Sequence, residues 1–194
     1  SYTCGKGRRV VREMTGRLVL VLVNKRLVTD QIVFTVGYDR GNWTKPEIAR
    51  QYQGAVTTDM YGRKIPKHAD GTANLKMQTG STKIITEAVM ELFDRIVDKR
   101  LLVRRVNIVT NRVVDESSAQ EWGSHGQLDL FTDYEAVRRQ EKEQAAELQR
   151  ERRRQEALLS IRKKFGKNMI LKGMNLEEGA TAKERNRQIG GHKA

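Results

Sequence analysis

Apolar side chains with helical or strand periodicity are concentrated in residues 1–116 of the 194-residue chain. A hydrophobic core needs several elements that each present one apolar face, so only this part can form a packed domain. The chain length allows one compact domain with extensions, or two small domains. We therefore predict a domain over residues 1–116, a linker over residues 117–132 and an extension over residues 133–194.

Two helices are predicted within this domain. The clearer one follows Gly80, with Ser81 as N-cap and an apolar stripe formed by Ile84, Ile85, Ala88, Val89, Leu92, Phe93, Ile96 and Val97. The other covers residues 8–27, where apolar residues recur mostly at i, i+4. Residues 18–23 could equally form a buried strand because three of them are β-branched. The stripe extends upstream of this run, which favours the helix.

Three strands are predicted at residues 31–38, 73–78 and 103–114, where apolar and polar residues alternate. Residues 39–71 are rich in Gly, Thr, Asp and Lys and contain both prolines, and residues 61–67 form a basic loop or hairpin tip. The order helix, strand, strand, helix, strand predicts an α+β fold class. We expect a small sheet with two helices packed on one face and the other face free.

The extension has a different composition. Residues 133–165 contain no Gly or Pro and are dense in Glu, Gln, Arg, Lys and Ala, which predicts a long exposed helix. Its apolar residues are sparse and follow no heptad, so a coiled coil is not favoured. One more short helix is predicted around residues 182–188.

Charge indicates a polyanionic partner. The net charge is +13, and the bases lie in two regions: residues 1–112 carry 21 Lys and Arg against 10 Asp and Glu, and residues 133–194 carry 16 against 10. Nucleic acid is favoured by such a balance because each neutralised phosphate releases a counterion. A basic surface that only keeps the chain soluble is the alternative.

The sequence gives little support to a secreted, membrane-spanning or metal-binding protein. Cys4 is the single cysteine, no apolar run is long enough to span a membrane, and no signal peptide is visible. The three histidines, His68, His125 and His192, lack metal-ligand spacing. We expect a cytoplasmic bacterial protein with no membrane partner and no evident metal or small-molecule ligand.

A short apolar peptide lies in the acidic gap between the two basic regions. It comprises Gln127, Leu128, Asp129, Leu130 and Phe131, after a polar stretch that contains glycine. Exposed apolar anchors on a linker are typical of a docking peptide. A strand or helix start packed on its own domain is the alternative.

These residues carry a resemblance to a known family. QLDLF at 127–131 is similar to the pentapeptide that bacterial polymerases insert into the sliding clamp. Nearly the whole chain resembles the C-terminal third to half of a Y-family (UmuC/DinB-like, ImpB/MucB/SamB) translesion DNA polymerase of the Gram-positive type. The supporting segments are VVREM (10–14), VGY (36–38), TDMYGRKIPKH (58–68), ELFDRI (91–96), FGKN (165–168), MNLEEGAT (174–181) and ERNRQIGGHKA (184–194).

The resemblance implies the little-finger domain, which lies along DNA and grips the template-primer backbone. It therefore implies a role in DNA repair, with DNA and the sliding clamp (β subunit) as partners. Two departures are evident. Only residues 1–3 could replace the strand that precedes the first helix in the family, and the palm, fingers and thumb are missing. Magnesium is expected only for that missing catalytic part.

Each residue of the clamp peptide has an expected role. Leu130 and Phe131 would enter an apolar cleft, and each would contribute about 1.5–3 kcal/mol if fully desolvated. Gln127 would hydrogen-bond at the mouth of the cleft, Leu128 would pack beside it, and Asp129 would face solvent or a base of the clamp.

DNA contacts are expected at strand edges and helix starts, without base-specific readout. The candidates are Arg63, Lys64, Lys67, Lys76, Lys83, Arg104, Arg105 and Arg112, with Ser81 and Thr82 at a helix N-terminus. Lys76, Arg104, Thr110 and Arg112 are expected on the free face of the sheet.

Catalysis by this chain alone is not expected. Asp115 and Glu116 end a strand pattern as palm carboxylates do, but a two-metal site needs a further acid from another strand and a nucleotide-binding lid. Two other functions stay open: a freestanding basic nucleic-acid-binding protein, and a fragment that competes with intact polymerases for the clamp. The start at Ser1 suggests a piece of a longer polypeptide or a trimmed product.

Overall fold

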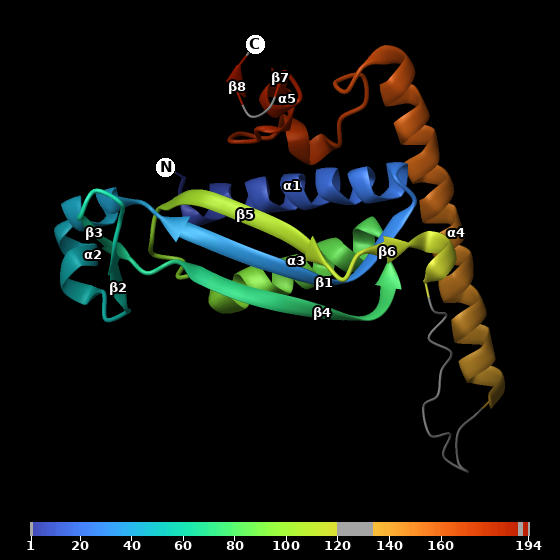
Figure 1. Cartoon of the computed structure of the whole chain (residues 1–194), viewed down its shortest axis with the longest axis horizontal. Coiled ribbons are helices and arrows are strands. Elements are labelled where there is room, and N and C mark those ends of the chain that lie inside the picture. Colours follow the sequence, from blue (N-terminus) through green and yellow to red (C-terminus); the bar gives the residue numbers. More distant parts are fainter. Residues whose placement is uncertain (1, 120–133, 190–191, 194) are drawn as a thin grey trace.

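The structure is a computed structural model that describes residues 2–119, 134–189 and 192–193. Its first part is an α+β domain in the predicted order, and the fold class is confirmed. The main elements are α1 (Cys4–Asn24), β1 (Leu27–Tyr38), β4 (Ala69–Thr79), α3 (Thr82–Ile96) and β5 (Val103–Asn111). Figure 1 shows these elements forming an elongated body with α4 at one end.

The sheet is antiparallel and has β1 at its centre. β4 and β5 flank β1, and the short strand β6 (Val114–Asp115) pairs with the start of β1. Phe34 lies opposite Gly71 of β4 and Ile108 of β5. Because side chains alternate between faces, this register places Ile32, Phe34 and Val36 together on one face, where all three are fully buried.

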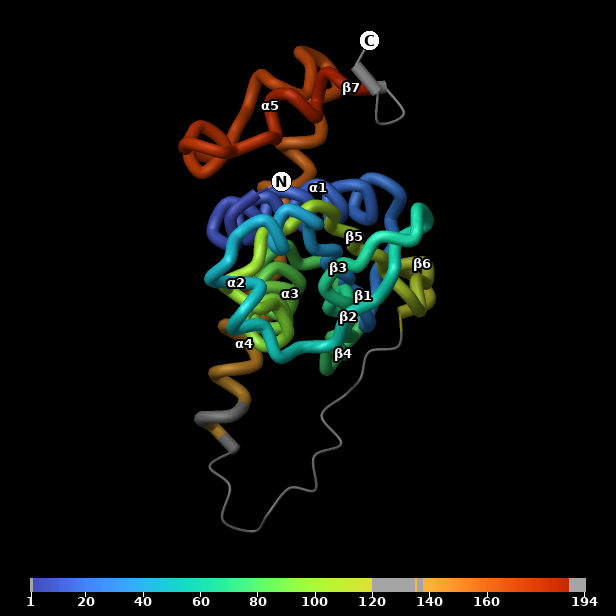
Figure 2. Tube along the Cα trace, turned by 90° about the vertical axis from the view of Figure 1, so that its left-hand side faces the viewer, coloured from blue at the N-terminus to red at the C-terminus, as the bar shows by residue number. Residues whose placement is uncertain are grey.

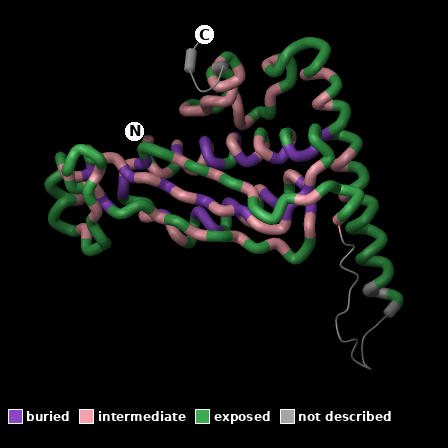
Figure 3. Tube along the Cα trace, in the orientation of Figure 1, coloured by how far each residue is buried: buried purple, intermediate pink, exposed green. Residues whose placement is uncertain are grey.

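α1 and α3 cover that face and form the core with it. Residues from α1, α3 and β1 make one apolar cluster, in which the rings of Phe34 and Phe93 lie 5.9 Å apart. Gly71 permits the close approach of α3, because a Cβ there would lie 2.9 Å from Leu92 Cδ1. Figure 3 shows the buried residues gathered between the helices and the sheet.

The first helix confirms the helical alternative for residues 18–23, which lie inside α1. α1 begins earlier than predicted, at Cys4, after Thr3 whose side chain accepts from the N–H of Lys6. The preceding residue Tyr2 forms an isolated β-bridge with Val103. Of the residues expected to replace a first strand, Tyr2 therefore contributes one bridge to the edge of β5.

Residues 40–66 form a small lobe at the end of the sheet remote from α4 (Figure 1). It contains η1 (Arg40–Thr44), α2 (Pro46–Gln51) and the strand pair β2 (Val56–Thr58) and β3 (Lys64–Pro66). The Trp43 indole N–H donates to the Lys64 carbonyl at 2.8 Å, and the Trp43 and Tyr52 rings lie 5.5 Å apart. The basic loop or hairpin tip predicted at residues 61–67 is confirmed in part: a hairpin is present, but its turn lies at residues 59–63 and Lys64–Pro66 form β3. α2 was not expected.

The long helix α4 (Tyr134–Phe165) is confirmed, but its C-terminal half is not a lone exposed helix. Gln155 is buried, and its amide donates to the Gly80 carbonyl and to Thr82 Oγ1, both at 2.9 Å. Periodicity could not predict this contact because polar side chains make it. Within the described residues, no helix is long and apolar enough to cross a membrane.

The segment after α4, described at residues 166–189 and 192–193, is called the tail. It lies over α1, on the side of α1 away from β4 (Figure 2). It contains η3 (Gly173–Leu176), α5 (Ala182–Arg185) and the strand pair β7 (Gln188–Ile189) and β8 (His192–Lys193). Glu13 of α1 is buried, and its carboxylate accepts from Asn175 Nδ2 at 2.8 Å and from Thr181 N and Oγ1 at 2.9 and 3.1 Å. The short predicted helix exists as α5, and hydrogen bonds join this part of the tail to the domain.

Two valine substitutions on β1 test the assignment of the two faces. We expect Val36→Ala to lower the free energy of unfolding by about 2–3 kcal/mol, because it removes buried methyl groups and leaves a cavity. Val33→Ala, on the opposite face, should cost less than about 1 kcal/mol. Urea unfolding followed by circular dichroism measures both. Equal losses would show that the second face is also packed.

Candidate nucleic-acid interface

The sheet face opposite α1 and α3 has no described helix packed on it. Its side chains form cross-strand rows: Asp70, Thr35 and Asn107; Thr72, Val33 and Val109; Asn74, Gln31 and Asn111. Residues of the two outer strands in these rows are exposed, while those of β1 are partly buried. The face is thus largely polar and uncharged, with room for a partner.

Amide side chains link the strands at one end of this face. Gln31 Nε2 donates to Asn74 Oδ1 at 2.8 Å, and Asn111 Nδ2 donates to Gln31 Oε1 at 3.3 Å. Arg112 donates to the same Asn74 oxygen at 3.0 Å and pairs with Asp30 at 3.0 Å. Arg112 is therefore part of a hydrogen-bonded network, and a phosphate would compete with Asp30 for it.

One predicted member of the free face is wrong. Thr110 lies opposite the buried residue Ile32, and cross-strand partners point to the same face. Thr110 therefore belongs to the helix-covered face. Thr110 was assigned to the free face as a polar residue of the predicted strand. Arg112, named with it, follows the end of β5 and has a positive φ of 49°.

Other predicted cations lie along the sheet edges with their charges available. Lys76 of β4 and Arg104 and Arg105 of β5 are exposed and form no ion pair with any described residue. Arg105 lies opposite Gly37 on the free face, and the register shift next to this pair leaves Arg104 unpaired. These cations can meet phosphates that run along the sheet.

Three predicted cations lie at the β2–β3 hairpin. One is bound to an acidic side chain of the hairpin, and the other two are exposed. Arg63 donates to Asp59 from Nε at 2.8 Å and lies 4.7 Å from the centre of the Tyr61 ring. Lys64 and Lys67 are exposed and make no ion pair within the described part of the chain. Arg63 therefore maintains the hairpin, and the two lysines provide its free positive charge.

The hairpin tip also exposes apolar surface that sequence analysis did not single out. Met60 and Tyr61 are 90% and 72% exposed. Gly62 next to them has a positive φ of 73°, which suits glycine in a tight turn. The Tyr61-Gly62 pair in the sequence is a signal for a turn. The exposure of Met60 and Tyr61 could not be predicted from it, because it depends on how the lobe packs. Such a tip can contact a sugar or a base beside the backbone.

The structure does not bring Ser81, Thr82 and Lys83 to the free face. They begin α3 and lie against α4. The Glu151 carboxylate accepts from Ser81 Oγ at 2.6 Å and from Lys83 N at 3.0 Å. Lys83 Nζ pairs with Glu147 at 3.0 Å. A carboxylate of the chain itself therefore occupies this helix N-terminus, and a phosphate could reach it only if α4 moved.

The candidate clamp peptide, Gln127, Leu128, Asp129, Leu130 and Phe131, lies outside the described residues.

The two acids considered as palm carboxylates have structural partners. Asp115 Oδ1 accepts from Ser117 N at 3.0 Å and begins η2 (Glu116–Ser118), and Glu116 pairs with Arg152 of α4 at 2.7 Å. Among residues 2–119, 134–189 and 192–193, no three His, Cys, Asp or Glu side chains are grouped so that they could hold a metal ion.

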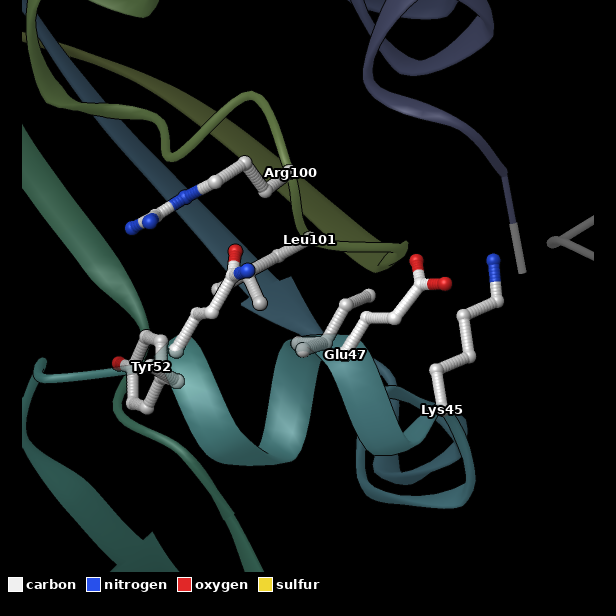
Figure 4. Close-up of a pocket in the computed structure, with 7 residues that line it drawn as sticks. Lys45, Glu47, Tyr52, Arg100 and Leu101 are labelled. Atoms are coloured by element: carbon white, nitrogen blue, oxygen red, sulfur yellow. The ribbon is translucent and has the colours of Figure 1, made fainter.

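A small pocket of about 280 Å³ lies between α2 and the segment before β5. Figure 4 shows Lys45, Glu47 and Tyr52 rising from α2 and its boundaries, with Arg100 and Leu101 on the other side. Arg100 pairs with Asp98 at 2.7 Å. The pocket thus combines charges of both signs and presents no concentrated positive charge to a phosphate.

No protein-family model, curated protein or solved structure matches this chain.

The Asp59–Arg63 pair should make the hairpin sensitive to acid. Hydrogen bonds from the Arg63 side chain lower the pKa of Asp59 from 3.8 to about 2. The contribution of this pair is complete above about pH 4 and is lost as the pH falls through about 2, because the folded state holds the ionised carboxyl. Carboxyl NMR of Asp59 should show this midpoint, and Arg63→Gln should raise it. An unchanged midpoint in Arg63→Gln would exclude the pairing.

Proposed function

We propose that this chain is the DNA-gripping and clamp-docking part of a Y-family translesion DNA polymerase. Its sheet domain holds the backbone of damaged template-primer DNA, and Gln127, Leu128, Asp129, Leu130 and Phe131 dock on the sliding clamp. It works in the bacterial cytoplasm during DNA repair. Phosphoryl transfer and its magnesium ions belong to a catalytic part outside this sequence.

The uncovered sheet face carries the proposal. It is largely polar, exposed cations border it on β4, β5 and the β2–β3 hairpin, and no described helix covers it. Cations at the edges can neutralise phosphates while the uncharged amide and hydroxyl groups between them contact sugar and phosphate oxygens. This arrangement favours sequence-tolerant binding because contacts to phosphates and sugars do not depend on the identity of the bases.

The fold adds a specific restriction to the proposal. Lys64, Lys67, Lys76 and Arg105 have exposed side chains without ion pairs among the described residues, so they can bind phosphate at no cost in existing contacts. Arg63 and Arg112 would have to leave acidic partners first. We therefore assign these four cations to the interface and give Arg63 and Arg112 a supporting role. Arg104 is also exposed and unpaired among the described residues, but it is left out because it lies at the register shift and has no cross-strand partner on the free face.

Removal of the four free cations should weaken DNA binding. We expect Lys64→Ala, Lys67→Ala, Lys76→Ala and Arg105→Ala together to lower the affinity for a primer-template duplex at low salt. The slope of log Kd against log salt should fall by about 0.9 for each lost phosphate contact. Fluorescence anisotropy with a labelled duplex measures both.

The matched control removes four exposed cations of α4 by Arg138→Ala, Arg139→Ala, Lys142→Ala and Lys163→Ala. It changes the net charge by the same amount and should retain most of the affinity and salt slope. Equal weakening in the two variants would indicate a general charge effect and reject the sheet face as the interface. It would favour a freestanding basic nucleic-acid-binding protein only if clamp binding were also missing.

Clamp docking should depend on the two terminal apolar residues of the peptide. We expect Leu130→Ala with Phe131→Ala to reduce affinity for the sliding clamp by about a hundredfold or more, because both anchors lose their burial. Asp129→Ala is the control and should bind nearly normally. Surface plasmon resonance on immobilised clamp gives the affinities, and circular dichroism checks the fold. Unchanged affinity in the double variant would refute the docking role.

A further inference from the structure

A groove of about 620 Å³ lies on the helix side of the molecule, between α1, the start of α3, α4 and the tail. It is separate from the free sheet face, because α1 and α3 lie between the two. Its volume is within the range of sites that enclose small organic ligands.

Positive charge is concentrated at the end of the groove formed by α1, α4 and the tail. Five cations there line the groove and form no ion pair with any described residue: Arg12, Arg17, Arg162, Lys172 and Arg185. The acid among them, Glu13, has both carboxylate oxygens occupied by Asn175 and Thr181. The other end is acidic, and there Glu147 and Glu151 contact Lys83.

The cationic end has hydrogen-bonding capacity that the described residues leave unused. Arg162 Nε is shielded from solvent and has no hydrogen-bond partner within the described part of the chain. Burial lowers the pKa of the Arg162 guanidinium, and the nearby Arg17 lowers it further. Burial also lowers the pKa of Lys172, with Arg12 and Arg162 adding to the effect. The cations therefore repel one another, and no described acid forms an ion pair with them. Glu13 acts on Arg185 and Glu151 on Lys172, but both carboxylates accept hydrogen bonds from other groups.

We propose that this groove binds a phosphate-bearing ligand of nucleotide size. Phosphate supplies negative charge that can pair directly with these cations, and it suits the planar guanidinium groups of Arg17 and Arg162. Arg162 Nη2 already donates to the Ile170 carbonyl at 3.2 Å, which holds this guanidinium in place. Apolar walls next to the cations, from Leu20, Leu158 and Met174, can pack against a nucleobase. A free nucleotide and the terminal nucleotide of a DNA strand share this chemistry.

The site depends on the tail being in place. Lys172, Met174 and Arg185 belong to the tail, and the bonds from Asn175 and Thr181 to Glu13 hold this segment against α1. A ligand in the groove would contact α1, α4 and the tail at once. It would therefore stabilise the attachment of the tail to the domain, since binding favours the state that contains the site.

The test uses the full 194-residue chain with dATP, inorganic phosphate and a 5′-phosphorylated oligothymidine as separate probes. Isothermal titration measures each affinity. We expect saturable binding of dATP or of the oligonucleotide end, tighter than that of phosphate, and a loss of about tenfold or more in Arg162→Gln and Arg17→Gln. Lys163→Gln, an exposed neighbour on α4, is the charge control and should bind normally.

A steric variant tests the groove without changing its charge. Gly16 lines the groove from α1, and a Cβ there would meet nothing within 4 Å. Gly16→Leu should therefore fold and block the ligand. Gly5→Leu is the matched control, because Gly5 is also in α1, has the same open space and lies outside the groove.

The outcomes separate the possible ligands. Loss of dATP binding in Gly16→Leu supports a free nucleotide, and loss of oligonucleotide-end binding alone supports a DNA strand. If no probe binds saturably, or Gly16→Leu and Gly5→Leu behave alike, the proposal is rejected. Phosphate that binds as tightly as the stronger of dATP and the oligonucleotide also rejects it. The sheet-face variant lacking Lys64, Lys67, Lys76 and Arg105 should retain nucleotide binding, so failure of either surface is recognised separately.

Discussion

Ile32, Phe34 and Val36 extend from alternate positions of β1 into the space beneath α1 and α3, and the other features of the domain depend on this packing. Because side chains alternate along a strand, the intervening residues Val33 and Thr35 lie on the opposite face of the sheet. The same three buried residues therefore determine which cross-strand rows remain uncovered. A shift of one residue in the pairing of β1 would bury polar groups and expose the core, so the register is strongly specified.

The sequence predicts those parts of the fold that rest on apolar periodicity. The stripe after Ser81 and the alternation in residues 31–38 were sufficient to place α3 and β1, and with them the two faces of the sheet. Polar attachments were not predictable. Glu151, Gln155 and Glu13 look like solvated side chains in sequence, and only the three-dimensional arrangement shows that they bind α3 and the tail.

The same distinction applies to the candidate sites. The excess of Lys and Arg over Asp and Glu indicated a polyanion as partner. The exposed side chains of Lys64, Lys67, Lys76 and Arg105 agree with that charge pattern. Whether a basic side chain is free to bind phosphate depends on its neighbours in the fold. Lys83 pairs with Glu147, and Arg63 pairs with Asp59. The groove on the helix side combines Arg17 with residues that lie far along the chain. No local pattern could have brought its parts together.

The Glu116–Arg152 ion pair at 2.7 Å fastens the end of the domain to the middle of α4. Residues 120–133 therefore connect two points, Ala119 and Tyr134, that belong to one folded body. Gln127 lies seven residues before Tyr134, so their Cα atoms are at most about 25 Å apart even in a fully extended chain. Covalent length alone therefore keeps the whole segment Gln127–Phe131 within about 25 Å of the start of α4. Any molecule that binds this segment must therefore come within the same distance of α4.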